Sequence, residues 1–143
     1  MLTMRIVLDT SVLVAALRSR SGAGNVVLRL VAQRRLILLA TPPLFLEYEE
    51  VLNRPEHRLV HMLSPQQLDS FLQELAALIE PVELHFRWRP QVHDTNDEMV
   101  LETAINGDAG ALVTYNTADF SVAAERFGIP VLTPAQLLKK VKP

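Results

Sequence analysis

Residues 5–17 read R-I-V-L-D-T-S-V-L-V-A-A-L, and within them a short apolar run ends abruptly at Asp9. Ile6 to Leu8 is too short and too rich in β-branched residues for a helix of its own, so it predicts a buried strand. A helix is expected to begin near Ser11. In open parallel α/β sheets, ligands bind in the crevice beyond the carboxyl ends of the strands. Asp9 is therefore a candidate functional residue, although an aspartate at this position is also a common helix N-cap.

Composition limits the class of protein. The 143 residues, 49% of them hydrophobic, predict a single domain over residues 1–143 with a sizeable core. The net charge of −2 excludes a broadly basic nucleic-acid binder, so contact with nucleic acid needs local arginines or a cation. The absence of cysteine excludes disulfides and cysteine-based zinc sites and suits the cytoplasm. Neither a signal peptide nor a membrane span is expected.

Strands are expected to alternate with helices along the rest of the chain. This order predicts an α/β fold of three layers, α/β/α, around a central, mostly parallel sheet of four to five strands. The Ser64 and Thr133 segments, each followed by proline and a glutamine, predict capped helix starts. The further strands are expected at 36–40, 82–86, 111–114 and 128–132, and the further helices at 25–35, 44–53, 64–80, 99–106, 123–127 and 134–141.

Acidic residues recur at the strand ends or early in the following helices. Periodicity places Glu47 and Glu49 on opposite borders of the buried stripe of their helix and does not choose between them. Acids in a first helical turn are also favoured by the helix dipole and need no further function. The candidates are Asp9, Glu47 or Glu49, Asp94 or Asp97, and Asp119.

If these acids converge, their charges repel strongly. Two unit charges about 4 Å apart cost about 4 kcal/mol at an effective dielectric constant of about 20, so a cluster must take up protons or a cation. Carboxylate oxygens suit Mg²⁺ or Mn²⁺. Such a site activates a water molecule against a phosphodiester and inverts the local charge, so that an acidic protein can bind nucleic acid. The alternative is a set of independent helix caps and surface acids.

Five stretches spread over nearly the whole chain point to a family. They are I-V-L-D-T-S-V at 6–12, E-Y-E-E-V-L-N-R-P at 47–55, D-T-N-D-E-M-V-L-E-T-A at 94–104, L-V-T-Y-N-T-A-D-F at 112–120 and V-L-T-P-A-Q-L-L at 131–138. In this order they resemble the successive motifs of PIN-domain proteins. The likeness is greatest to the toxin components of bacterial and archaeal toxin–antitoxin pairs that are related to VapC toxins.

The resemblance implies an endoribonuclease that depends on Mg²⁺ or Mn²⁺, cuts an RNA substrate, is held inactive by a cognate antitoxin and forms a homodimer. No RNA-binding residue is assigned by it. Many family members carry aspartate where this chain has Asn116, which offers a carbonyl oxygen without charge. By motif position, the metal-binding and catalytic residues are Asp9, Glu47, Asp97 and Asp119, with Asp94, Asn116, Thr10, Ser11 and Thr114 as accessory residues.

Other interpretations remain open. The chain could be a non-catalytic PIN-like module whose acids bind a metal or a partner. A phosphoryl-aspartate enzyme would also place its nucleophile at a strand end, but such enzymes generally use a lysine, and no lysine precedes Lys139. His57 and His61 have the i, i+4 spacing of metal ligands on a helix, although surface histidines are commoner. Arg87, Trp88 and Arg89 could contact phosphate and stack on a base, or pack on the protein body.

Overall fold

A parallel sheet forms the centre of the molecule. The computed structural model describes residues 3–85 and 94–141. All adjacent strands of the five-stranded sheet run parallel, in the order β3-β2-β1-β4-β5, which confirms the predicted sheet. Its strands are β1 (Met4–Leu8), β2 (Leu36–Ala40), β3 (Ile79–Pro81), β4 (Ala111–Val113) and β5 (Val131–Leu132).

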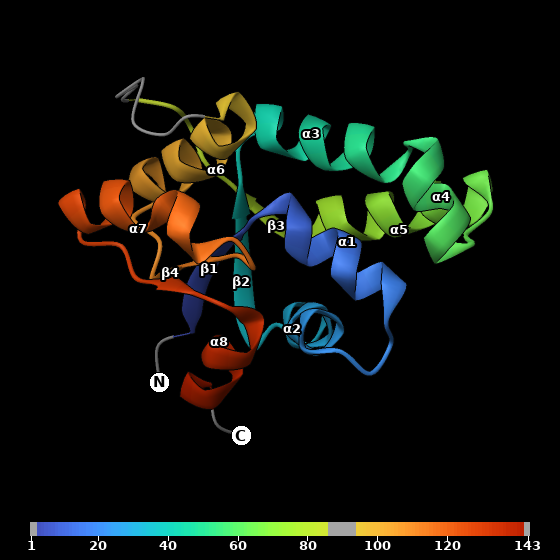
Figure 1. The fold of residues 1–143 in the computed structure, drawn as a ribbon, viewed down its shortest axis with the longest axis horizontal. Helices are drawn as coiled ribbons and strands as arrows, with labels where there is room; N and C mark the ends of the chain where they lie inside the picture. Colours follow the sequence, from blue (N-terminus) through green and yellow to red (C-terminus); the bar gives the residue numbers. More distant parts are fainter. Residues whose placement is uncertain (1–2, 86–93, 142–143) are drawn as a thin grey trace.

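Helices cover both faces of this sheet, so the predicted three-layer α/β/α fold is confirmed (Figure 1). The helices α1, α2 and α8 pack together on one side, and α6 packs with α7 on the other. In Figure 1, α1, α3, α4 and α5 lie to the right of the sheet and α6 and α7 to its left. The bounds are α1 (Thr10–Arg18), α2 (Ala23–Ala32), α3 (Pro42–Leu52), α4 (Pro55–His61), α5 (Pro65–Leu78), α6 (Thr95–Asn106), α7 (Thr117–Arg126) and α8 (Pro134–Lys140).

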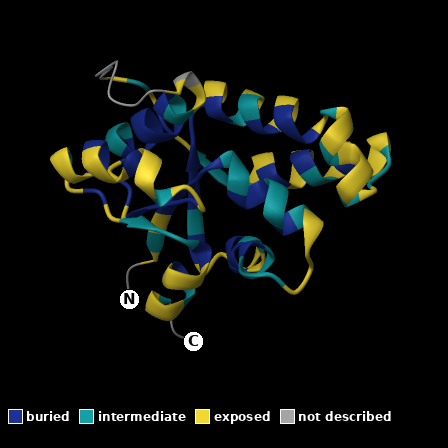
Figure 2. Cartoon of the chain, in the orientation of Figure 1, coloured by how far each residue is buried: buried dark blue, intermediate teal, exposed yellow. Residues whose placement is uncertain are grey.

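The predicted strand before Asp9 is the central strand of the sheet. Ile6, Val7 and Leu8 are completely buried, as expected for a strand covered on both faces (Figure 2). After β1 the chain adds β2 and β3 on one side of it, and later adds β4 and β5 on the other. The strand order therefore reverses next to β1, and the crevice at such a switch point is where α/β sheets bind ligands.

The edge strand differs from the prediction. A strand was expected over 82–86, but β3 is Ile79–Pro81, and 82–85 are not in a strand. The helix expected to reach residue 80 ends at Leu78. Ile79 pairs with Leu38 of β2, and the N–H of Val82 still donates to the carbonyl of Ala40 at 3.0 Å. The apolar periodicity of α5 continues through Ile79, so the pattern does not reveal where pairing with β2 ends the helix.

Several helix boundaries also differ from the prediction. The helices expected at 99–106 and 123–127 begin earlier, at Thr95 and Thr117, and the charged segment after residue 54 forms α4. The α6 helix begins early because Asp94 caps it, its Oδ1 accepting from the N–H of Asn96 at 2.7 Å. The capping boxes predicted at Ser64 and Thr133 are both confirmed.

Two further expectations concern residues 87–89 and the absence of a membrane span. Arg87, Trp88 and Arg89 lie outside the described residues. Within 3–85 and 94–141, no helix combines the length and the apolar character needed to cross a lipid bilayer.

Candidate functional site

An open cleft of about 580 Å³ lies beyond the carboxyl end of β1. Its walls come from α1, α3, the turn into α4, the start of α6 and the segment after β4. Most of the polar residues singled out in the sequence meet here. Those that line it are Asp9, Thr10, Ser11, Glu47, Asp94, Asp97 and Asn116.

Asp9 is held in this cleft by hydroxyl groups. Its side chain is 6% exposed, and its Oδ2 accepts from Ser11 Oγ at 2.8 Å and from Thr114 Oγ1 at 2.7 Å. Neither bond uses Oδ1. Asp9 occupies the N-cap position of α1 but makes no side-chain capping bond. The interpretation of this side chain as a helix cap is therefore wrong, and the carboxylate points elsewhere.

Thr114 bonds to Asp9 from the residue after β4, the strand that pairs with β1. It is completely buried, and its Oγ1 accepts from the N–H of Asn116 at 2.9 Å, so its own proton is free to point at Asp9. The hydroxyl of buried Tyr48 donates to the carbonyl of Leu8. Burial and the negative charge of Asp9 both raise the pKa of Tyr48, which keeps this donor protonated. The Asp9 carboxylate is thus held by Ser11 and Thr114, and Tyr48 holds the backbone of Leu8 just before it.

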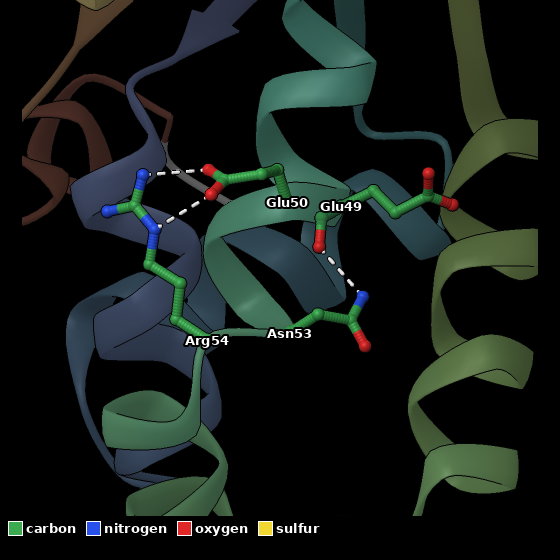
Figure 3. A network of polar contacts seen from close by, with 4 residues as sticks. All are labelled: Glu49, Glu50, Asn53 and Arg54. Atoms are coloured by element: carbon green, nitrogen blue, oxygen red, sulfur yellow. Dashed lines mark hydrogen bonds and ion pairs between the residues drawn. The ribbon is translucent and has the colours of Figure 1, made fainter.

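The structure distinguishes Glu47 from Glu49. Glu47 is half-buried and lines the cleft, whereas Glu49 is exposed and is not among the lining residues. Figure 3 shows Glu49 and Glu50 extending to opposite sides of α3. Burial and the charge of Glu50 raise the pKa of Glu47, and the positive charge of Arg54 opposes them. Of the two candidates, Glu47 is therefore the acid that faces the site.

Asp97 shows that the acids act on one another. It lies half-buried in the first turn of α6. Burial raises its pKa to about 7, together with the negative charges of Asp9, Asp94 and Asp119. Acids at the starts of α1, α6 and α7 therefore create one region of excess negative charge.

Asp119 differs from the other predicted acids in its position. It is exposed in the first turn of α7 and does not line the cleft, although its charge reaches Asp97. Asn116 lines the cleft from the N-cap position of the same helix. Thr114 lies behind the cleft wall, where its hydroxyl bonds to Asp9 and to the N–H of Asn116.

The cleft also contains Arg18, Arg54 and Tyr115, which the sequence analysis did not single out, together with His57, which it did. The signal that could have found the first is the spacing of Ser11, Ala15 and Arg18, which places them on one face of α1. His57 and His61, for which surface histidines were the favoured interpretation, do not form a pair of metal ligands. Both ring nitrogens of His61 bond to backbone, Nδ1 accepting from the N–H of Leu63 at 3.0 Å and Nε2 lying 3.1 Å from the Leu52 carbonyl.

The donor set suits a hard divalent cation. It consists of carboxylate, amide and hydroxyl oxygens, and the raised pKa of Asp97 marks a negative charge that a cation would relieve. Among the described residues, no three aspartate, glutamate or histidine side chains are close enough to form a metal site as they stand. The residues therefore fit Mg²⁺ or Mn²⁺ in the chemistry of their donor atoms.

The fold and the site define the class of the protein, a parallel α/β domain with a carboxylate-lined cleft at its strand ends. The family model described as the PIN domain matches residues 5–118, so the chain belongs to the PIN-domain family. PIN domains are generally nucleases and typically depend on divalent metals. No curated protein matches the chain.

Proposed function

We propose that this protein is an Mg²⁺- or Mn²⁺-dependent endoribonuclease, the toxin of a toxin–antitoxin pair that acts in the cytoplasm. The observation that carries the proposal is the convergence of Asp9, Glu47 and Asp97, from separate elements, on one open cleft in a PIN domain. Independent helix caps do not account for it, because the side chain of Asp9 caps nothing.

The residues that would hold the metal are Asp9, Glu47 and Asp97, with Asp94, Asn116 and Asp119 nearby. A bound divalent cation supplies a more acidic water and stabilises charge on phosphate oxygens. Ser11 and Thr114 orient the Asp9 carboxylate through its Oδ2, so Oδ1 is the atom left to face a ligand. Asp97 holds or releases a proton near pH 7 when no cation is present.

The test is incubation of purified protein with single-stranded RNA of defined sequence and Mn²⁺. We expect internal cleavage that EDTA stops and that Asp9→Asn loses, because a neutral amide cannot replace the central carboxylate. The alternative, a non-catalytic PIN-like module, predicts stabilisation by Mn²⁺ without hydrolysis of any RNA. That outcome would contradict the enzyme proposal while leaving the metal site intact.

We further propose that a cognate antitoxin covers part of the protein and that the protein forms a homodimer. The support is exposed apolar surface on α4 and the residue that follows it, where Leu59 and Met62 are 77% and 78% exposed and line a groove of about 560 Å³. Exposed apolar side chains that adjoin one another mark interaction surfaces. Light scattering should give twice the mass of the chain, and a monomer at all concentrations would contradict the homodimer.

A further inference from the structure

The cleft has two chemically different ends. Asp9, Asp94 and Asp97 lie where α1 and α6 begin, whereas Arg18, Arg54 and His57 come from the end of α1, the turn after α3 and α4. On α1, Ser11 and Arg18 lie on one face, and the seven helical steps from one to the other span about 10 Å at 1.5 Å per residue. The wall from α3 repeats this order, with Glu47 first, Val51 next and Arg54 in the turn that follows.

The arginines at the far end differ in their partners. Arg18 is exposed and has no ion pair among the described residues. Arg54 is paired with Glu50 by two bonds, from Nε to Oε1 at 3.1 Å and from the terminal nitrogen to Oε2 at 2.7 Å (Figure 3). Glu50 itself does not line the cleft. The carboxylate therefore holds the guanidinium in a bidentate geometry that a phosphate also fits.

We infer that Arg18 and Arg54 form a phosphate-binding site that takes the backbone phosphate next to the one at the acidic end. The inference rests on the proposed ribonuclease function and adds to it the residues that contact the flanking substrate. A polynucleotide strand carries phosphates in series, so a strand lying along α1 meets the acids with one phosphate and the arginines with another. Glu50 competes with the strand for Arg54, and binding exchanges one anionic partner of that guanidinium for another.

The occupant follows from the charges and the shape of the cleft. Arg18 and Arg54 face one cleft from two different elements, so they favour a ligand with anionic groups at intervals rather than a generally acidic surface. Tyr115, 45% exposed and also lining the cleft, offers a face on which a base can stack. Single-stranded RNA has both features.

The test measures binding of a fluorescent single-stranded hexanucleotide RNA in EDTA, which prevents cleavage, at several salt concentrations. Arg18→Gln should weaken binding roughly tenfold at low salt and reduce the slope of log K against log salt by about 0.7, the value for one phosphate on a single strand. Arg29→Gln is the matched control, because Arg29 is exposed on α2 and does not line the cleft. A purely structural role of Arg18 at the end of α1 would change thermal stability and leave this slope unaltered.

Glu50→Gln tests the inference through an expected gain of affinity, which damage to the fold would not produce. Removing the carboxylate frees Arg54 for phosphate, so binding should become severalfold tighter. Glu49→Gln is the control, because this substitution changes the charge by the same amount one residue away. Glu49 extends to the other side of α3 (Figure 3). A DNA hexanucleotide of the same sequence should respond to both variants as RNA does, because phosphate is the group contacted.

The inference would be overturned by equal loss in Arg18→Gln and Arg29→Gln, by equal affinity of Glu50→Gln and Glu49→Gln, or by no binding of the RNA to the parent protein. An effect confined to RNA would also overturn it, because it would assign the contact to the ribose. The outcome is separable from that of the proposed function. Binding with this pattern but without Mn²⁺-dependent cleavage would contradict the nuclease proposal and support the phosphate-binding site. Mn²⁺-dependent cleavage without this binding pattern would support the nuclease proposal and contradict the phosphate-binding site.

Discussion

Asp97 is the residue whose protonation depends most on its surroundings. It precedes Leu101 and Ala104 by four and seven residues, so it lies on the stripe of α6 that packs into the core. This position half-buries the carboxyl group and directs it toward Asp9. The raised pKa of about 7 follows from that burial and from the neighbouring charges.

We predict that Asp97→Asn stabilises the metal-free protein above pH 7. The folded-state pKa of about 7 exceeds the ordinary 3.8, so the folded protein binds a proton that the unfolded chain releases between those values. The free energy of unfolding therefore falls as the pH rises through this window. Asp97→Asn avoids this loss, so its free energy of unfolding should exceed that of the parent by roughly 1 kcal/mol, a figure that allows for solvent screening at a half-exposed group. Urea unfolding in EDTA at pH 4, 6 and 8 measures it.

The control for this prediction is the pH profile itself. At pH 4 the parent carboxyl is largely protonated, so the two proteins should differ little there and diverge toward pH 8. A constant difference across the range would contradict the assignment of the shifted pKa to Asp97.

Thr114→Val tests the support of Asp9. Valine keeps the shape of the buried side chain but removes the hydroxyl that donates to Oδ2 at 2.7 Å. We expect a loss of about 1–3 kcal/mol in the free energy of unfolding, because a nearly buried carboxylate loses one of its donors. Ser11→Ala removes the other donor from a half-buried position and should cost less. Equal and negligible effects of both would show that neither hydroxyl holds Asp9.

At the scale of elements, the site depends on how α6 is placed against the sheet. The start of α6 supplies Asp94 and Asp97 to the cleft, and its end packs at Gly107 against β2. A Cβ at Gly107 would lie 2.9 Å from Leu39 Cδ1 and 3.0 Å from Val82 Cγ2. Glycine is thus required here by close approach, since its φ of −88° is open to any residue.

Gly107→Ala should therefore destabilise the protein by about 1–3 kcal/mol, the usual cost of overpacking a core. Urea unfolding measures it. Leu39→Val removes the clashing Cδ1 atom, so the double variant should lose less than the sum of the two single variants. Strict additivity would contradict the contact as the cause.

At the scale of the whole molecule, metal binding and folding are linked, because the acids meet only in the folded chain. Mn²⁺ at about 100 times its Kd should add about 2.7 kcal/mol to the free energy of unfolding, which raises the Tm by several degrees. The shift should be larger at pH 8 than at pH 6, since protons compete for Asp97. Differential scanning fluorimetry measures it.

Two variants test whether Asp97 is a ligand of the bound Mn²⁺. Asp97→Asn should lose most of the Mn²⁺ shift, whereas Glu49→Gln, which removes an exposed acid outside the cleft, should keep it. A shift in Asp97→Asn that equals the parent's would exclude Asp97 as a ligand.

The sequence by itself determined the features that depend on neighbouring residues. The apolar run before Asp9 predicts a strand because both faces of a central parallel strand are buried. The capped starts at Ser64 and Thr133 were predictable because each motif satisfies its own backbone groups. These interactions span only a few residues, so their pattern is visible in the chain.

Only the tertiary structure decided which side chains share the cleft. The hydrogen bond from Thr114 to Asp9 joins residues 105 positions apart, and periodicity left Glu47 and Glu49 equivalent until α3 was placed beside α1 and α6. The start of β3 and the arginine end of the cleft were likewise outside the reach of local pattern. The physical reason is that periodicity reports which face of an element is buried, whereas a site depends on which elements pack against each other.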